Sequence, residues 1–262
     1  MHIKHGSFFL YICMQKNILT VLMLFAFCIV CMAKGKRVLF IGDSITDGAW
    51  GNSKVWNTPS EERNHSDMNH IYGHGYMMIC ASHYQGLYPQ DEYVFWNRGI
   101  SGNTLDDLSA RWQKDAISLN PDVVSILIGT NDVDKALRKG NTIDVDVWKA
   151  QYKALLDSTL SINPEVRFIL CTPFVAKAGR MADTSDYNER ELMISSLQIA
   201  IASIAQEYNA VLVPFDILVR DKITSNPDIP ASYWIWDGIH PTPAMHYLMA
   251  QMWIDSADGV IK

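Results

Sequence analysis

The sequence predicts an α/β fold built on a parallel sheet, and three observations lead to this prediction. Short apolar runs alternate along the chain with segments of helical spacing. The runs are continuously apolar, as is typical of strands covered on both faces. No linker, internal repeat or low-complexity tract divides the chain, so one domain is expected. Strands and helices in alternation favour parallel pairing through right-handed crossovers.

Five apolar runs predict the strands. They are bounded by residues that interrupt strands: Gly42 follows the first, Pro121 and Gly129 enclose the third, and Pro173 comes after the fourth. The predicted strands cover residues 37–41, 93–96, 122–128, 167–171 and 211–215.

Helices are expected between and after these strands. The segment 105–119 spaces its apolar residues along one face, and longer helical segments cover 145–162 and 189–208. A last helix is expected over 243–254, because Thr242 is a favourable N-cap and Pro243 suits the first helical position.

The composition and charge of the chain argue against two classes of binding partner. Of the 262 residues, 48% are hydrophobic, enough for a sizeable core, and the formal net charge is −6. No basic stripe is present, which argues against nucleic acid and against an anionic membrane surface as partners of the mature chain. The sequence does not predict an oligomeric state.

The N-terminus has the pattern of a secretory signal peptide. Lys16 precedes an apolar run over 18–32, and Ala33 supplies a small residue for cleavage. The run is shorter than the ~20 residues of a membrane-spanning helix. We therefore expect a signal peptide at 1–33, a catalytic domain at 34–262 and export to the periplasm or medium.

A lipid anchor on Cys28 or Cys31 is a less favoured alternative, because the preceding Phe27 and Val30 are bulky. The mature chain keeps two cysteines, Cys80 and Cys171, both in apolar runs. Buried thiols are expected, although an oxidising compartment would also permit a disulfide.

Ser44 lies directly after the first predicted strand, in the segment Gly-Asp-Ser-Ile-Thr. Open α/β sheets bind their ligands at the carboxyl ends of the strands. The serine is therefore a candidate nucleophile, although in this position it can also simply cap the next helix.

Asp237 and His240 lie three residues apart, just before the last predicted helix. A serine hydroxyl needs a base to remove its proton, and that base needs a third group to orient it. The spacing allows Asp237 to hold one ring nitrogen of His240 and leave the other for Ser44. A loop histidine beside a capping aspartate is the alternative.

Two further turns offer hydrogen-bond donors for an oxyanion. Gly102 follows the second strand and lets the backbone N–H approach a ligand closely. Asn131 follows the third strand and can donate through its side-chain amide. With the N–H of Ser44 they would form an oxyanion hole, although each is also an ordinary turn or cap residue.

These four blocks, IGDSIT, ISGNT, IGTND and DGIHPT, resemble the GDSL or SGNH hydrolase family in content and order. Thr46 departs from the Leu of the family name. The resemblance implies a three-layer α/β/α flavodoxin-like sandwich with strand order 2-1-3-4-5. It also implies a serine esterase that acts through a Ser-His-Asp acyl-enzyme mechanism, with no metal and no cofactor.

Four tryptophans near the predicted catalytic residues bear on the substrate. Trp50 and Trp56 follow the nucleophile, and Trp234 and Trp236 precede Asp237. Aromatic rings at a site can stack on sugars, although each tryptophan can equally belong to the core. With export and a resemblance to acetylxylan-esterase-like members, they suggest acetyl esters of carbohydrate.

A lysophospholipase or thioesterase is the alternative activity, and a glycan-binding module that has lost catalysis is a more remote one. The polar segment 52–74 is expected to form a wall of the site. It carries His65, His70, His74 and Asp67, but no metal is expected there, because the glycines beside His74 weaken the helix that shared ligands would need.

Overall fold

The computed structural model describes residues 35–49 and 71–262, of which Lys36–Lys262 form a compact unit. Its centre is a sheet of five parallel strands in the order β2-β1-β3-β4-β5. This confirms the predicted fold class and strand order. The strands are β1 (Arg37–Gly42), β2 (Val94–Gly99), β3 (Val123–Leu127), β4 (Arg167–Cys171) and β5 (Val211–Val213).

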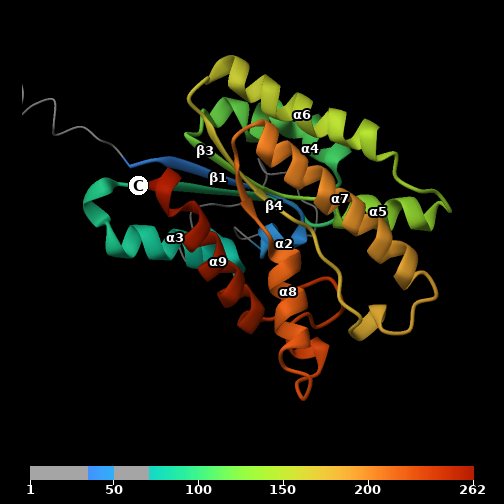
Figure 1. Ribbon diagram of the computed structural model, residues 1–262. Coiled ribbons are helices and arrows are strands. Elements are labelled where there is room, and N and C mark those ends of the chain that lie inside the picture. Colours follow the sequence, from blue (N-terminus) through green and yellow to red (C-terminus); the bar gives the residue numbers. More distant parts are fainter. Residues whose placement is uncertain (1–34, 50–70) are drawn as a thin grey trace, which may run out of the picture. The chain divides into compact units, whose positions relative to one another are not determined.

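Helices cover both faces of this sheet and bury its apolar runs (Figure 1). Alternate residues of each strand enter two separate cores: Phe40 of β1 faces one layer, and its neighbours Leu39 and Ile41 face the other. This arrangement explains why the strand sequences do not alternate between apolar and polar residues.

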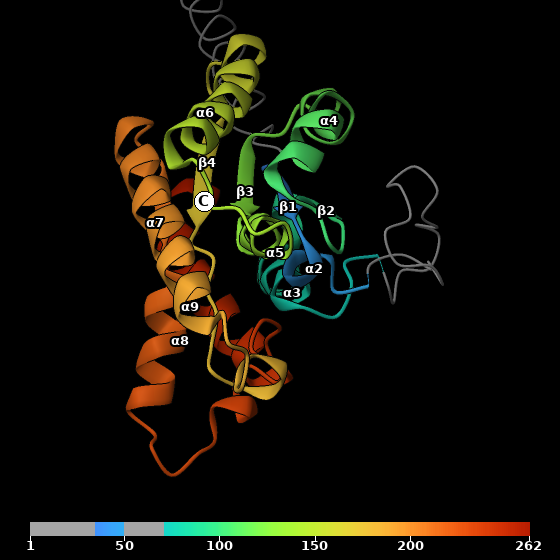
Figure 2. The same cartoon turned by 90° about the vertical axis from the view of Figure 1, so that its right-hand side faces the viewer.

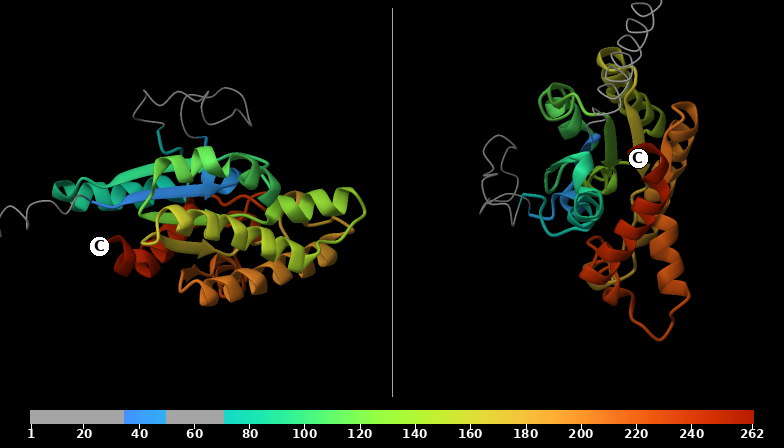
Figure 3. Two further views of the ribbon diagram at one scale, coloured as in Figure 1. Left: turned by 90° about the horizontal axis from the view of Figure 1, so that it is seen from above. Right: turned by 90° about the vertical axis from the view of Figure 1, so that its left-hand side faces the viewer.

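One layer contains three helices that share a core with Phe40: α3 (Tyr76–Leu87), α8 (Phe215–Thr224) and α9 (Pro243–Ile261). The other face carries α4 (Leu105–Asp115), α6 (Val145–Ile162) and α7 (Tyr187–Glu207) in that order, seen from above in Figure 3 (left). The shorter helix α5 (Thr130–Arg138) follows β3 and contributes Val133 to the same core.

Several element boundaries differ from the prediction. The segment 105–119 ends as a helix at Asp115 and continues as a 3-10 turn, Ile117–Leu119. The run 211–215 is a strand only to Val213, because Pro214 ends it and Phe215 starts α8. Helix α9 extends to Ile261, seven residues beyond the prediction for its end at 254.

The cysteines Cys80 and Cys171 are free and buried in the core beneath the α3–α8–α9 layer, as expected for structural thiols. Burial raises the pKa of Cys171 to about 12. The predicted signal peptide lies outside the described residues. Among the helices that the structure does describe, none is both long enough and apolar enough to cross a bilayer.

Candidate active site

Ser44 is the first residue of the short helix α2 (Ser44–Asp47), which follows β1 directly (Figure 2). The preceding residue, Asp43, caps this helix through a hydrogen bond from the backbone N–H of Ile45 at 3.0 Å. Burial raises the pKa of the Asp43 carboxyl to about 7, although that hydrogen bond opposes the shift. The cap holds Ser44 in place at the carboxyl end of the sheet.

A chain of hydrogen bonds joins Ser44, His240 and Asp237. Ser44 Oγ lies 2.8 Å from His240 Nε2, and His240 Nδ1 lies 2.8 Å from Asp237 Oδ2. The three side chains come from opposite ends of the sequence and meet in the arrangement that the sequence predicts. With the proton on Nδ1, the imidazole can accept the hydroxyl proton of Ser44 through Nε2.

Hydrogen bonds within the loop that carries Asp237 and His240 hold its backbone in a fixed conformation. Trp236 donates its backbone N–H to the His240 carbonyl at 3.1 Å, and Ile235 forms a bridge with Pro241. Asp237 Oδ1 accepts backbone N–H groups of Ile239 at 3.0 Å and His240 at 2.7 Å. One carboxylate oxygen therefore holds the loop, while the other faces the imidazole ring.

The electrostatics of Asp237 suit a group that orients a base. Its side chain is 7% exposed, and burial alone would raise its pKa. The hydrogen bonds from the His240 ring and from the backbone of His240 and Ile239 outweigh burial and hold this pKa well below its ordinary range. Asp237 is therefore ionised at neutral pH.

The turn that carries Gly102 is bonded to Asn131, the second residue of α5, and to α2. The turn 100–103 closes through the Asn103 N–H and the Ile100 carbonyl at 3.2 Å, and Gly102 has φ 81° there, which favours glycine. Asn131 Nδ2 donates to the Asn103 carbonyl at 3.1 Å. The Ser101 N–H donates to Asp47 Oδ2 at 2.9 Å.

These bonds bring the three predicted oxyanion donors to one edge of the sheet. Within the described part of the chain, the backbone N–H groups of Ser44 and Gly102 have no intramolecular acceptor. Asn131 uses one of its two amide hydrogens on Asn103 and keeps the other for a ligand. The set can therefore donate to an oxygen that gains negative charge.

Two side chains that the sequence did not point to hold this edge together: Asn97, which is buried, and His246, which is partly buried. The Asn97 amide nitrogen lies 2.8, 3.1 and 2.9 Å from the carbonyls of Thr46, Asp47 and Tyr72. His246 on α9 accepts the N–H of Tyr76, the first residue of α3, at 3.1 Å. Burial lowers the pKa of His246 to about 4, so its ring stays neutral and caps α3. Neither residue carries a local sequence signal.

The two tryptophans before Asp237 occupy different environments. Trp236 is 59% exposed, and its ring stacks beside that of His240 with centroids 6.2 Å apart. Trp234 is 9% exposed and belongs to the core beneath α8 and α9, so the prediction that it contacts substrate is wrong. Trp50 and Trp56 lie outside the described residues.

Of the four residues considered and rejected as metal ligands, only His74 falls within the described ranges, where it is exposed. His65, Asp67 and His70 lie outside those ranges. Across residues 35–49 and 71–262, no three His, Cys, Asp or Glu side chains are grouped as a metal site requires. The absence of a cofactor and of a metal remains a prediction of the family resemblance.

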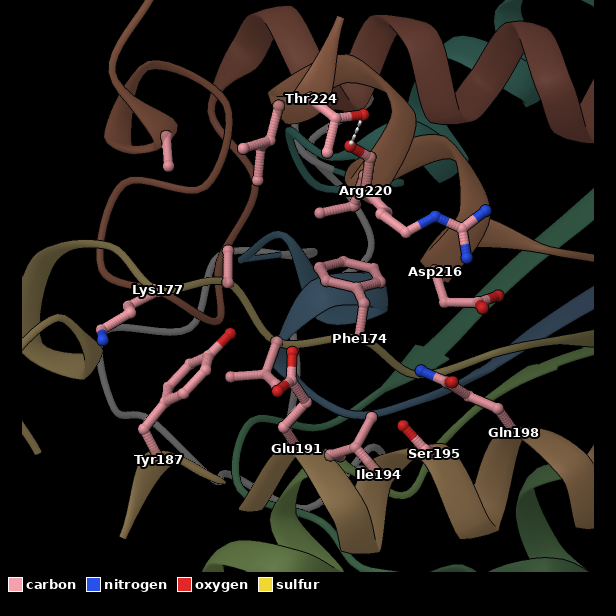
Figure 4. A pocket seen from close by; sticks show the side chains of 15 residues that line it. Phe174, Lys177, Tyr187, Glu191, Ile194, Ser195, Gln198, Asp216, Arg220 and Thr224 are labelled. Atoms are coloured by element: carbon pink, nitrogen blue, oxygen red, sulfur yellow. Dashed lines mark hydrogen bonds between the residues drawn. The ribbon is translucent and has the colours of Figure 1, made fainter. Parts of the chain in front are cut away.

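A pocket of about 310 Å³ lies apart from the catalytic residues, between α7, α8 and the segment after β4 (Figure 4). Two of its polar lining residues have partners within the protein: Gln198 donates to the Pro173 carbonyl, and Arg220 pairs with Asp221. None of Ser44, Asp237 and His240 lines it. The hydrogen-bonded chain of Ser44, His240 and Asp237 therefore lies at the edge of the sheet and does not line this pocket.

Comparison with known proteins agrees with this geometry. Residues 40–248 match the model of the GDSL-like lipase/acylhydrolase family. An acetylxylan esterase from Geobacillus stearothermophilus is 32% identical over 231 residues, which cover 85% of this chain and 94% of that enzyme.

Solved structures show the same likeness. A GDSL-like lipase from Parabacteroides merdae has a TM-score of 0.72 at 31% identity, over 87% of this chain and 97% of that one. The crystal structure of the Geobacillus acetylxylan esterase has a TM-score of 0.67 at 28% identity, over 85% and 94%. The family match, the shared fold and the four motif blocks lead to one conclusion: this chain belongs to the GDSL-like lipase/acylhydrolase family.

Proposed function

We propose that this ester hydrolase is an exported serine esterase that removes acetyl groups from carbohydrate, with Ser44 as nucleophile, His240 as general base and Asp237 as its orienting group. The observation that carries the proposal is the continuous chain from Ser44 Oγ through His240 to Asp237, with both links at 2.8 Å. Crystal structures of the Geobacillus relative include catalytic mutants in which a serine or an aspartate is replaced by alanine.

The reaction proceeds in two acyl transfers. Ser44 Oγ attacks the ester carbonyl carbon while His240 Nε2 takes its proton, and Ser44, Gly102 and Asn131 donate to the resulting oxyanion. The intermediate collapses, His240 returns the proton to the leaving alcohol oxygen, and the acyl group stays on Ser44. Water then gives a proton to His240 and attacks the acyl-enzyme; the second tetrahedral intermediate collapses, the acid leaves, and His240 returns the proton to Ser44 Oγ.

Acetyl specificity is supported by the acetylxylan esterase relative and is tested by an acyl series. We expect p-nitrophenyl acetate to be hydrolysed with a higher kcat/KM than the octanoate ester. A pocket shaped for acetyl does not gain the ~0.8 kcal/mol that each buried methylene contributes to binding in an apolar trough.

The Ser44→Ala protein, which lacks the proposed nucleophile, gives the background rate of hydrolysis for each ester of the series. A kcat/KM that climbs steadily with chain length contradicts the acetyl assignment and favours the lysophospholipase or thioesterase alternative.

The sugar assignment is supported by the position of Trp236. His240 protonates the leaving alcohol, so that alcohol must lie beside the imidazole ring, where the exposed Trp236 ring also lies. The side chain is therefore placed to contact the leaving group of the ester and not its acyl part.

We expect Trp236→Ala to raise KM for an acetylated xylo-oligosaccharide about tenfold and to leave KM for ethyl acetate nearly unchanged, because ethanol has no ring to stack. Steady-state kinetics on both substrates checks this. Trp234→Ala is the contrast, since loss of a core tryptophan typically costs ~3–5 kcal/mol of stability and impairs both substrates together. Equal loss on both substrates for Trp236→Ala contradicts a role in sugar binding.

Export is supported by the basic, apolar and small-residue pattern of the first 33 residues. Mass spectrometry of the N-terminus of the protein recovered from its native cells tests it, with a mature chain that begins near Lys34 as the expected result. A chain that keeps the apolar run contradicts it.

A further inference from the structure

A second charged group contacts the carboxylate that orients His240. Arg180 Nε lies 3.2 Å from Asp237 Oδ2, the same oxygen that pairs with His240 Nδ1. Arg180 lies in a 3-10 turn, Gly179–Met181, 57 residues before Asp237 in the chain. The guanidinium and the imidazole therefore share one carboxylate oxygen.

The backbone around Arg180 packs closely against the catalytic loop. Gly179 has φ 49°, and a Cβ atom added there would lie 2.5 Å from Asp237 Cα and 2.5 Å from the Trp236 carbonyl oxygen. The Ala176 N–H donates to the Gly238 carbonyl at 2.9 Å. Only glycine permits this approach, which holds the main chain next to Arg180 close to the catalytic loop.

A small apolar cluster supports the same contact from behind. Met181, next to Arg180, packs with Tyr187 and with Ile239 of the catalytic loop, and all three are buried. Arg180 is 51% exposed, so its ion pair contributes little to stability. The Asp237 carboxylate that it contacts is only 7% exposed, and charges at partly buried groups are screened less by solvent than those at fully exposed groups.

We propose that Arg180 is a positioning residue for the base, whose guanidinium keeps His240 unprotonated, and therefore competent, at lower pH than Asp237 alone would allow. The inference rests on the proposed role of His240. A guanidinium near the ring disfavours imidazolium, and it shares the carboxylate charge that would otherwise favour imidazolium. The orientation of Asp237 does not depend on Arg180, because Oδ1 keeps its two backbone donors.

Among the described residues, Asp43 and His246 are titratable groups that also interact with the His240 ring. Asp43 interacts with the ring as an opposite charge from the N-cap of α2, and His246 interacts with it from α9. Asp43 and His246 are unchanged in an Arg180 variant. A shift in the pH profile of that variant therefore measures the effect of removing the guanidinium.

The test is the pH dependence of kcat/KM for p-nitrophenyl acetate, followed by acetate release, for wild type, Arg180→Gln, Arg180→Lys and Arg138→Gln. Arg138 is an exposed arginine on α5, and its replacement changes net charge equally. We expect the midpoint of the rise in activity to move upward by about 0.5–1 pH unit in Arg180→Gln at low salt, with a plateau within about threefold of wild type. Arg180→Lys and Arg138→Gln should keep the wild-type midpoint, and 1 M salt should reduce the shift.

Two outcomes separate this inference from the proposed function. An active, Ser44-dependent wild type with the same midpoint in Arg180→Gln and Arg138→Gln overturns the role of Arg180 and leaves the esterase intact. A lowered plateau of kcat/KM in Arg180→Gln with an unchanged midpoint also overturns the role of Arg180, because that is the result expected of a contact that only supports the structure. Ester hydrolysis that persists in Ser44→Ala instead overturns the proposed function itself.

Discussion

Replacing Ser44 by Ala is expected to lower kcat/KM for p-nitrophenyl acetate by roughly 10³-fold or more. The substitution removes the atom placed to attack the ester, Ser44 Oγ, and its hydrogen bond to His240 Nε2. The oxyanion donors and the cap of α2 by Asp43 stay in place. The fold should therefore survive, and a thermal melt should show a midpoint within a few degrees of wild type.

Ser101→Ala is the matched control for this experiment. Ser101 lies in the adjoining turn and contributes its backbone N–H, which alanine retains, to Asp47 Oδ2. It should keep activity within a few-fold of wild type. A folded Ser44→Ala protein with near wild-type turnover would contradict the assignment of the nucleophile.

Replacing Asp237 by Asn is expected to lower kcat by roughly 10³–10⁴-fold, and the structure gives the reason. Oδ1 accepts two backbone N–H groups, so the amide oxygen of the introduced asparagine must take that position. Its NH₂ group then faces His240 Nδ1, whereas in the wild type Oδ2 accepts a hydrogen bond from the Nδ1–H. The ring must accept at Nδ1 and carry its proton on Nε2, where it can no longer receive the proton of Ser44.

The ring tautomer can be measured directly by ¹⁵N NMR of histidine-labelled protein. We expect His240 to carry its proton on Nδ1 in the wild type and on Nε2 in Asp237→Asn, with both proteins folded by thermal melt. A folded variant that keeps kcat within tenfold of wild type, or one whose tautomer does not change, contradicts this account of Asp237.

The sequence allowed the sheet to be predicted well because its strands are buried on both faces. Such strands are continuous apolar runs, and each predicted run corresponds to a strand in the structure. The residues after β1, β2 and β3 were also predictable, because parallel strands bring their carboxyl ends to one edge. The helices α3, α5 and α8 were missed, since two of them are short and α3 lacks a clear apolar face.

Contacts between distant segments could not be predicted from the sequence. Arg180 and Asn97 have no motif around them, and only the fold brings each beside a site residue. The difference between Trp234 and Trp236 has a similar origin. Trp234 directly follows the 3-10 turn Ala231–Tyr233 and lies in the core, whereas Trp236 lies beyond the bridged residue Ile235 and faces solvent. Two tryptophans two positions apart carry no sequence signal that separates these environments.

The central claim is that Ser44 forms a covalent intermediate, and active-site labelling tests it most directly. Wild-type protein is treated with a fluorophosphonate, which traps activated serines, and the modified residue is identified by peptide mass spectrometry. We expect one adduct per chain, on Ser44, with loss of esterase activity in proportion to labelling and no adduct in Ser44→Ala. An active enzyme that is labelled on another residue, or that hydrolyses esters while Ser44 stays unmodified under the same treatment, contradicts this claim.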